Sequence, residues 1–277
     1  MAGTRLLPPV NPPEEVPLMS RARWSQRLLG PPLAAAILAL SLGANTAGAY
    51  QGSAYENYTA FQACMGWSSG MTDTMRAQAV NALAALGYTS TWYRRTAFTR
   101  SQVLSRAGAD QAVYVQSHGD QYYTVYPTKV QGFREDAGVC SGAGKVFATD
   151  IKARRSSTPA HIVVMSTCHL GEPPATLGQP SMAEAYGIAQ RRSARNDSVG
   201  YGPVFYLGYT GDAWLDDQLK FERSFWAYAT TAYTLGQAFD LALAYSGKAS
   251  RTVPTWFGTY LYSGFPWAPS PPCTRCA

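Results

Sequence analysis

Charged side chains are scarce in this chain of 277 residues, in which Asp, Glu, Lys and Arg make up 14%. Disordered chains carry more charge and few aromatic residues, whereas 13% of this chain is aromatic and 46% is hydrophobic. This composition excludes a wholly disordered chain and predicts a packed core. The net charge is +6, and basic residues occur as short pairs such as Arg94-Arg95 rather than as dense runs. The sequence therefore does not indicate nucleic-acid binding.

Long apolar runs are also rare, and one lies near the N-terminus. Arg21, Arg23 and Arg27 precede an apolar run over 31–42, and the small residues at 47–49 follow it. This order is typical of a secretory signal peptide. The run is shorter than the ~20 apolar residues that a spanning helix needs. We therefore expect residues 1–49 to be an N-terminal extension with a signal peptide, the product to be secreted, and no stable membrane span to remain after cleavage. An uncleaved anchor helix is the alternative.

Cysteine is infrequent, and all five cysteines follow the predicted leader: Cys64, Cys140, Cys168, Cys273 and Cys276. Export would place them in an oxidising compartment, where disulfides persist. An odd number leaves at least one thiol unpaired or pairs it with another chain. The last two form Cys-x-x-Cys in a proline-rich tail, residues 269–277, where a disulfide is favoured over a redox motif. If four cysteines pair among themselves, Cys168 is a candidate for the one left over.

Beyond residue 49, helix and strand patterns alternate without an internal repeat. Continuous apolar strands are predicted over 112–116, 160–168 and 203–212, and such runs suit strands that are covered on both faces. We predict helices from residue 72 or 73 to 86 and over 181–190, and two more between 212 and 247 with a break near Gly236, before a last aromatic strand. The pattern predicts one domain over residues 50–268, of α/β class, built as a three-layer α/β/α sandwich with a mostly parallel sheet.

Two of these strands end in residues that can perform chemistry. The first ends in Ser-His-Gly-Asp over 117–120, and the second in Ser-Thr-Cys-His-Leu-Gly over 166–171. Sites gather at the carboxyl ends of strands in such sheets. A thiolate from Cys168 can attack a carbonyl, and an imidazole within reach can protonate the leaving amine. Backbone N–H groups beside the two residues can stabilise the oxyanion.

His-Gly at one strand end and Cys-x-x-Gly at the next, in that order, resemble the caspase-like cysteine peptidases. This group includes caspases, metacaspases, legumains, gingipains, clostripains and separases. SHGD resembles the SHG and DHG forms of the group, and TCHLG resembles the SCHSG form of metacaspases and the ACESG form of legumains. The interval from His118 to Cys168 is close to the caspase spacing of roughly 50 residues. The resemblance covers about 110–266.

The resemblance implies a caspase-like fold and an exported cysteine endopeptidase that acts on peptide or protein substrates. It implies that His118 is the catalytic acid/base and that Cys168 is the nucleophile. It also implies that the backbone N–H groups of Gly119 and Cys168 form the oxyanion hole. No cofactor is implied, although some members need calcium, and no third catalytic side chain is obligatory in the group.

The sequence departs from the group at the positions that set specificity. STCHLG replaces the caspase QAC-x-G pattern, so specificity for aspartate is not supported. Metacaspases place an aspartate two residues before the cysteine, where this chain has Ser166. A preference for a basic side chain would need another acid, and four candidates stay open: Asp120, Asp212, Asp216 and Asp217. The loop 172–180 is expected to shape the substrate cleft.

Other interpretations of the same residues remain. His118 could be a structural histidine, and Cys168 could be a core residue or half of a disulfide. The chain would then be a catalytically inactive caspase-like binding module, or a disulfide-stabilised secreted interaction domain. A zinc site from Cys168, His169 and His118 lacks obvious further ligands. A papain-like enzyme would place its cysteine before its histidine, and no predicted strand is followed directly by the GxSxG of serine hydrolases.

Overall fold

The computed structural model describes residues 50–57, 69–136, 144–155, 158–193, 203–246 and 251–265. All of them belong to one compact unit, Gly48–Ala277. The predicted leader over 1–49 lies outside the described residues, as do Cys64, Cys140, Cys273 and Cys276. Within the described part, no helix combines the length and the apolar character needed to cross a bilayer.

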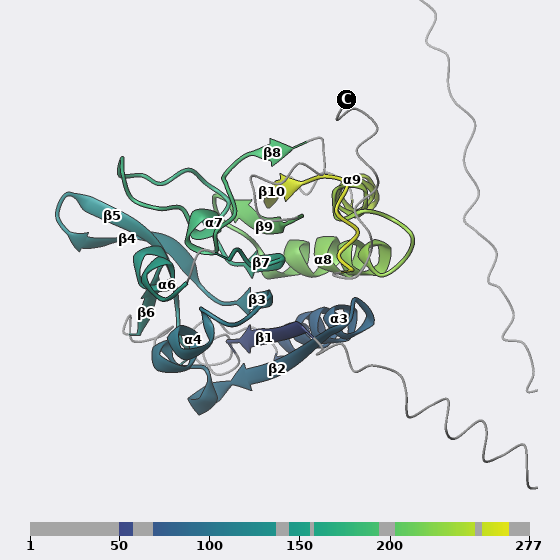
Figure 1. Cartoon of the computed structure of the whole chain (residues 1–277), viewed down its shortest axis with the longest axis horizontal. Coiled ribbons are helices and arrows are strands. Elements are labelled where there is room, and N and C mark those ends of the chain that lie inside the picture. The colour runs from purple at the N-terminus through teal and green to yellow at the C-terminus, as the bar shows by residue number, and fades with distance from the viewer. Residues whose placement is uncertain are drawn as a thin grey trace, which may run out of the picture. The chain divides into compact units, whose positions relative to one another are not determined.

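A seven-stranded sheet organises the described residues, with the order β2-β1-β3-β7-β9-β10-β8 (Figure 1). Its strands are β1 Tyr50–Glu56, β2 Tyr88–Arg94, β3 Ala112–Gln116, β7 Ile162–Ser166, β8 Arg192–Ser193, β9 Phe205–Thr210 and β10 Val253–Thr259. The strands from β2 to β9 in this order pair in parallel, and β10 pairs antiparallel with β9. The carboxyl ends of the parallel strands therefore meet at one edge, where β3 and β7 are neighbours.

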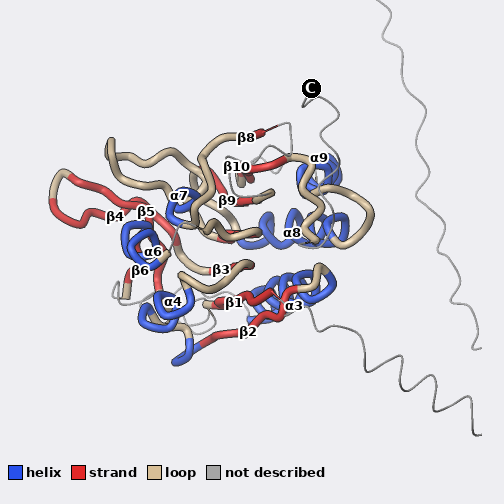
Figure 2. Tube along the Cα trace, viewed as in Figure 1, coloured by secondary structure: helices blue, strands red, loops and turns tan. Residues whose placement is uncertain are grey.

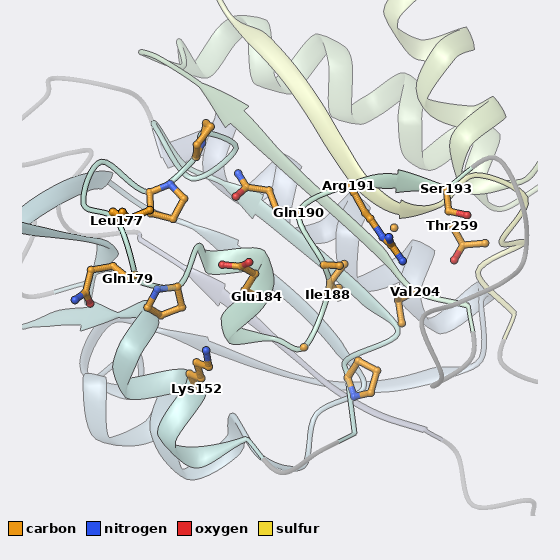
Figure 3. A pocket seen from close by; sticks show the side chains of 18 of the residues that line it. Lys152, Leu177, Gln179, Glu184, Ile188, Gln190, Arg191, Ser193, Val204 and Thr259 are labelled. Carbon is orange, nitrogen blue, oxygen red and sulfur yellow. The ribbon is translucent and has the colours of Figure 1, made fainter.

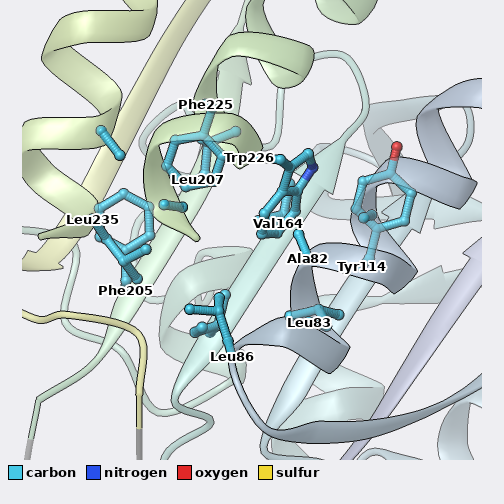
Figure 4. Packing of buried hydrophobic residues seen from close by; sticks show 14 of the residues in the cluster. Ala82, Leu83, Leu86, Tyr114, Val164, Phe205, Leu207, Phe225, Trp226 and Leu235 are labelled. Carbon is cyan, nitrogen blue, oxygen red and sulfur yellow. The ribbon is translucent and has the colours of Figure 1, made fainter. Parts of the chain in front are cut away.

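Two groups of helices cover the two faces of this sheet (Figures 1 and 2). On one face lie α3 Ser69–Ala85, α8 Leu215–Ala229 and α9 Leu235–Tyr245, and on the other lie α4 Arg100–Arg106, α6 Ala148–Arg154 and the short α7 Met182–Ala185. Each face has its own apolar core, and Figure 4 shows Leu83, Phe225 and Trp226 packed against strand residues in the first of them. The predicted three-layer sandwich with a mostly parallel sheet is confirmed.

Between β3 and β7 the chain forms a second, three-stranded sheet. Its antiparallel strands are β4 Gly119–Val125, β5 Thr128–Arg134 and β6 Lys145–Phe147, with β5 in the centre. The β4–β5 hairpin extends away from the large sheet (Figure 2). Because β4 begins one residue after His118, the hairpin is anchored at the edge where the predicted site lies.

Several local predictions were wrong, for identifiable reasons. The chain breaks between the last two helices at 230–234, not near Gly236, which lies in the first turn of α9. A Cβ at Gly236 would lie 2.2 Å from the Tyr260 ring, so this glycine serves close packing rather than a helix end. The helix predicted from residue 72 or 73 to 86 begins at Ser69 and ends at Ala85, and Gly87 follows it with a positive φ of 91°. The helix expected over 181–190 has only four residues, although its capping box from Ser181 to Glu184 is present.

Candidate active site

His118 and Cys168 occupy equivalent positions on neighbouring strands. The parallel register of β3 and β7 pairs Gln116 with Ser166, and His118 and Cys168 each follow two residues later. The N–H of Ser117 continues the pairing, because it donates to the Ser166 carbonyl at 3.4 Å. Both predicted residues line one cavity of about 320 Å³, together with Gly119. The fold therefore brings the predicted dyad and one predicted oxyanion donor to a single place.

The Cys168 thiol is half-buried and forms no disulfide. Its Sγ accepts a hydrogen bond from the Ala213 N–H at 3.3 Å and lies 3.8 Å from the Ala213 carbonyl oxygen. Burial raises the pKa of Cys168; the Ala213 amide opposes this, while Asp212 and Asp120 add to it. The resting sulfur is thus a neutral thiol at pH 7, and a base is needed to make it nucleophilic.

The His118 ring has the opposite electrostatic setting. Burial lowers the pKa of His118, and the guanidinium of Arg134 lowers it further. The imidazole is therefore neutral at pH 7 and able to accept a proton. Its backbone is held by β5, because the Arg134 N–H donates to the His118 carbonyl at 3.0 Å. A neutral thiol and a neutral imidazole are the starting forms that proton transfer from Cys168 to His118 requires.

Gly119 brings the backbone of β4 into contact with the cysteine loop. A Cβ on Gly119 would lie 2.5 Å from the Cys168 carbonyl oxygen and 2.9 Å from the Thr167 side chain. No larger residue fits this approach without moving one of the two segments. The glycine after the histidine is thus explained by the closeness of the two strand ends. The same contact places the two predicted oxyanion donors, the N–H groups of Gly119 and Cys168, on adjoining segments.

Asn57 supports the histidine segment, and the sequence analysis missed it. It directly follows β1, the strand beside β3, and its side chain is buried. Its Nδ2 donates to Ser117 Oγ at 3.1 Å, Ser117 Oγ donates to the Arg134 carbonyl at 2.5 Å, and the Asn57 N–H donates to the Gln116 carbonyl at 2.9 Å. The residue before His118 is therefore fixed from two sides. The sequence could have indicated Asn57 only if residues 50–56 had first been recognised as a strand, because a polar residue at the end of a buried strand is then a candidate for a structural role.

His169 lies at the rim of the same cavity and turns its ring toward carboxylates. Its backbone is left-handed, with φ of 60°. Nδ1 lies 2.8 Å from Glu172 Oε1, and Nε2 lies 3.3 Å from Asp212 Oδ1. Although burial alone would lower the pKa of His169, its hydrogen bond to Glu172 raises it overall. Both ring nitrogens are engaged by these acids, so His118 remains the better candidate for the base.

The structure separates the four acids that the sequence left open. Asp120 and Asp212 line the cavity, and 83% of the Asp212 side chain is exposed. Asp216 and Asp217 instead pair with Arg251, at 3.0 and 3.4 Å. Only the first two are therefore placed to meet a substrate bound at Cys168.

The remaining histidine lies apart from this chemistry. His161 precedes β7, at the opposite end of the strand from Cys168, and its Nδ1 lies 3.3 Å from the Tyr88 hydroxyl. Within the described ranges, no three His, Cys, Asp or Glu side chains are grouped so as to hold a metal ion. The roles predicted for His118, Gly119 and Cys168 stay predictions that this geometry accommodates.

Comparison with known proteins gives fold likenesses only. No family model matches the chain, and no curated protein is similar to it in sequence. Among solved structures, it is similar to the Arg-specific cysteine proteinase gingipain R, with 14% identity and a TM-score of 0.45 over 71% of this chain and 41% of that chain. It is also similar to a protein from Geobacter sulfurreducens, with 12% identity and a TM-score of 0.44 over 77% of this chain and 97% of that chain. This chain thus spans about two fifths of the length of gingipain R.

Proposed function

We propose that this protein is an exported cysteine endopeptidase that cleaves peptide bonds with Cys168 as nucleophile and His118 as acid and base. The observation that carries the proposal is the placement of both side chains at the carboxyl ends of paired strands, in one cavity with Gly119. The protonation states support it, since burial keeps the Cys168 thiol protonated and the His118 ring neutral.

In the proposed reaction, His118 takes the proton from Cys168 as the sulfur attacks the substrate carbonyl carbon. The N–H groups of Gly119 and Cys168 donate to the oxyanion, each contributing about 3 kcal/mol to transition-state stabilisation. The tetrahedral intermediate collapses to a thioester, and His118 gives its proton to the leaving amine. His118 then removes a proton from the attacking water and returns one to the sulfur when the thioester is hydrolysed.

The rim of the cavity favours a cationic substrate side chain next to the cleaved bond. Asp120 and Asp212 both line the cavity, and Asp212 is well exposed. An exposed carboxylate at a cleft attracts an ammonium or guanidinium group, most strongly at low salt. We therefore include a preference for lysine or arginine in the proposal, with Asp120 and Asp212 as the contacts.

The test compares the wild-type chain with Cys168→Ala, His118→Ala and the matched control His161→Ala. Each protein is treated with iodoacetamide without reductant, its modified cysteines are mapped by mass, and it is assayed on a mixed peptide library. We expect Cys168 to be alkylated, cleavage after basic residues, and loss of cleavage in the first two variants only. Alkylation of Cys168 without cleavage of any peptide would favour the inactive binding module instead. A disulfide at Cys168 would refute the proposal.

A further inference from the structure

A second and larger cavity lies apart from Cys168. Its volume is about 740 Å³, and it shares no lining residue with the Cys168 cavity. Its walls are the loop 173–180, the turn 187–191 after α7, and the ends of β8 and β10. Figure 3 shows the lining side chains as a band from Leu177 and Gln179 at one side to Ser193 and Thr259 at the other. We call this feature the α7 groove.

The α7 groove has an apolar lining that the fold covers only in part. Pro180 and Ile188 are buried, Pro174 is half-buried and Pro173 is exposed. Leu177 on the rim is fully exposed. A fully exposed leucine contributes nothing to the core of its own chain. Leu177 and Pro173 therefore offer apolar surface to an occupant of the groove.

The charges in the α7 groove are unequal. Lys152 and Arg191 line it as exposed cations, and Glu184 is the one carboxylate among the lining residues. Glu184 is engaged in the helix cap, because its Oε2 accepts from the Ser181 N–H at 2.8 Å. The charged side chains of the groove therefore sum to one net positive charge, and its two cations can pair with an acidic partner.

The loop that forms one wall is held in place by hydrogen bonds. The Glu172 carbonyl accepts from Gln131 Nε2 at 2.7 Å and from Gln190 Nε2 at 2.6 Å. Further along, the Lys129 N–H donates to Thr176 Oγ1 at 2.8 Å. A wall fixed before binding lowers the entropy cost of docking. Glu172 directly precedes this loop, and its carboxylate holds His169 at the rim of the Cys168 cavity.

We propose that the α7 groove docks an extended polypeptide segment in which apolar residues and prolines are flanked by acidic residues. An open band of lining side chains suits an extended chain, and proline-rich segments hold that conformation at low entropy cost. The acidic flanks pair with Lys152 and Arg191, and the apolar residues cover Leu177 and the proline wall. Resting on the proposed function, we assign this segment to the protein substrate, at a distance from the cleaved bond.

Binding is tested directly, in a Cys168→Ala background that cannot cleave the probe. The probes are the fluorescein-labelled peptides ELPPLPE and KLPPLPK, followed by fluorescence anisotropy. We expect the acidic probe to bind and the basic probe to bind more weakly. Exchanging Lys152 and Arg191 together for glutamate should weaken the acidic probe about tenfold and reverse the preference. Leu177→Ser should weaken both probes, and the control exchange of the exposed Lys220 and Arg223 for glutamate should change neither.

Several results would overturn the proposal. These are no binding of the acidic probe, equal binding of the two probes, or unchanged affinity in the Lys152/Arg191 variant. A change of oligomeric state in that variant, seen by sedimentation, would assign the groove to a second copy of the chain instead. All exchanged side chains are exposed, so circular dichroism should show that each variant is folded.

Enzyme kinetics test whether the α7 groove binds the substrate. A short cleavable peptide is compared with the same peptide joined to ELPPLPE by a flexible linker. We expect the extension to lower KM in the wild type and to have no effect in the Lys152/Arg191 variant, while the short peptide is cleaved equally by both. If neither peptide is cleaved, the proposed function fails while the anisotropy result still decides on the groove. If both are cleaved with equal KM, the substrate assignment fails.

Discussion

Glu222→Gln is expected to remove a strong pH dependence of stability. Glu222 lies in α8 with no exposed surface. Its Oε2 accepts from the Tyr114 hydroxyl at 3.0 Å and its Oε1 from the Tyr209 hydroxyl at 2.9 Å. These tyrosines belong to β3 and β9, so one carboxyl joins two strands to a helix. Burial raises the pKa of Glu222 from 4.5 to about 7, even though its hydrogen bonds act in the opposite direction.

The size of the effect follows from this shift in pKa. Because the folded state binds the proton more tightly than the unfolded state, the contribution of Glu222 is fully present below pH 4.5. It is lost as the pH rises toward 7. A shift from 4.5 to about 7 corresponds to about 3 kcal/mol of unfolding free energy. Above pH 7 the loss is complete and the curve is flat. Glutamine keeps the shape of the side chain without a titrating proton.

The assay is urea unfolding at pH 4.5, 5.5, 6.5 and 7.5, followed by tryptophan fluorescence. The difference in unfolding free energy between wild type and Glu222→Gln should shift by about 3 kcal/mol across this range, in favour of the variant at high pH. Ser101→Ala, at an exposed residue that does not titrate, serves as the control, and its curve should run parallel to that of the wild type. Parallel curves for the wild type and Glu222→Gln would show that Glu222 ionises normally in the fold, and would refute the reasoning.

Three further predictions concern the candidate active site. Because burial raises the pKa of Cys168, its rate of alkylation by iodoacetamide should still be rising at pH 9, and a plateau below pH 8 would contradict the neutral thiol. Gly119→Ala should lower kcat/KM at least about 100-fold, because its Cβ would overlap the Cys168 carbonyl. The control Gly70→Ala, where a Cβ meets nothing, should leave kcat/KM unchanged. Equal effects of the two substitutions would contradict the steric argument. Asn57→Ala should lower kcat about tenfold at constant KM and destabilise the fold by about 1–3 kcal/mol. Asn81→Ala is the exposed control, and a change confined to KM would place Asn57 in substrate binding instead.

The strand ends that carry the candidate site were predictable because β3 and β7 are continuous apolar runs. Such runs identify buried strands without knowledge of the fold, and the residues that follow them are then known. β1 lacks such a run, since Gly52, Ser53 and Glu56 interrupt it, although five of its seven residues are buried. Gly52 is needed because a Cβ there would lie 2.8 Å from the Ala112 carbonyl oxygen. This requirement for glycine arises from the packing of β1 against β3. It produces no pattern in the sequence around residue 52 that would predict a strand.

The choice among the candidate acids could not be made from the sequence for a similar reason. Asp212 and Asp216 are four residues apart, yet one faces the cavity and the other pairs with Arg251. The difference depends on where α8 begins and on the position of residue 251, which follows the two helices. The support that Asn57 gives to Ser117 likewise joins residues 60 positions apart. Both are tertiary contacts, and the pattern of residue types does not record them.

Glu172 contacts both the α7 groove and the rim of the Cys168 cavity. Its carbonyl accepts from Gln190 on the α7 groove, while its carboxylate lies 2.8 Å from the His169 ring. If an occupant of the groove moved Gln190 and with it Glu172, the proton affinity of His169 would change. Coupling free energies are reciprocal, so protonation of His169 would then change the affinity of the groove by the same factor.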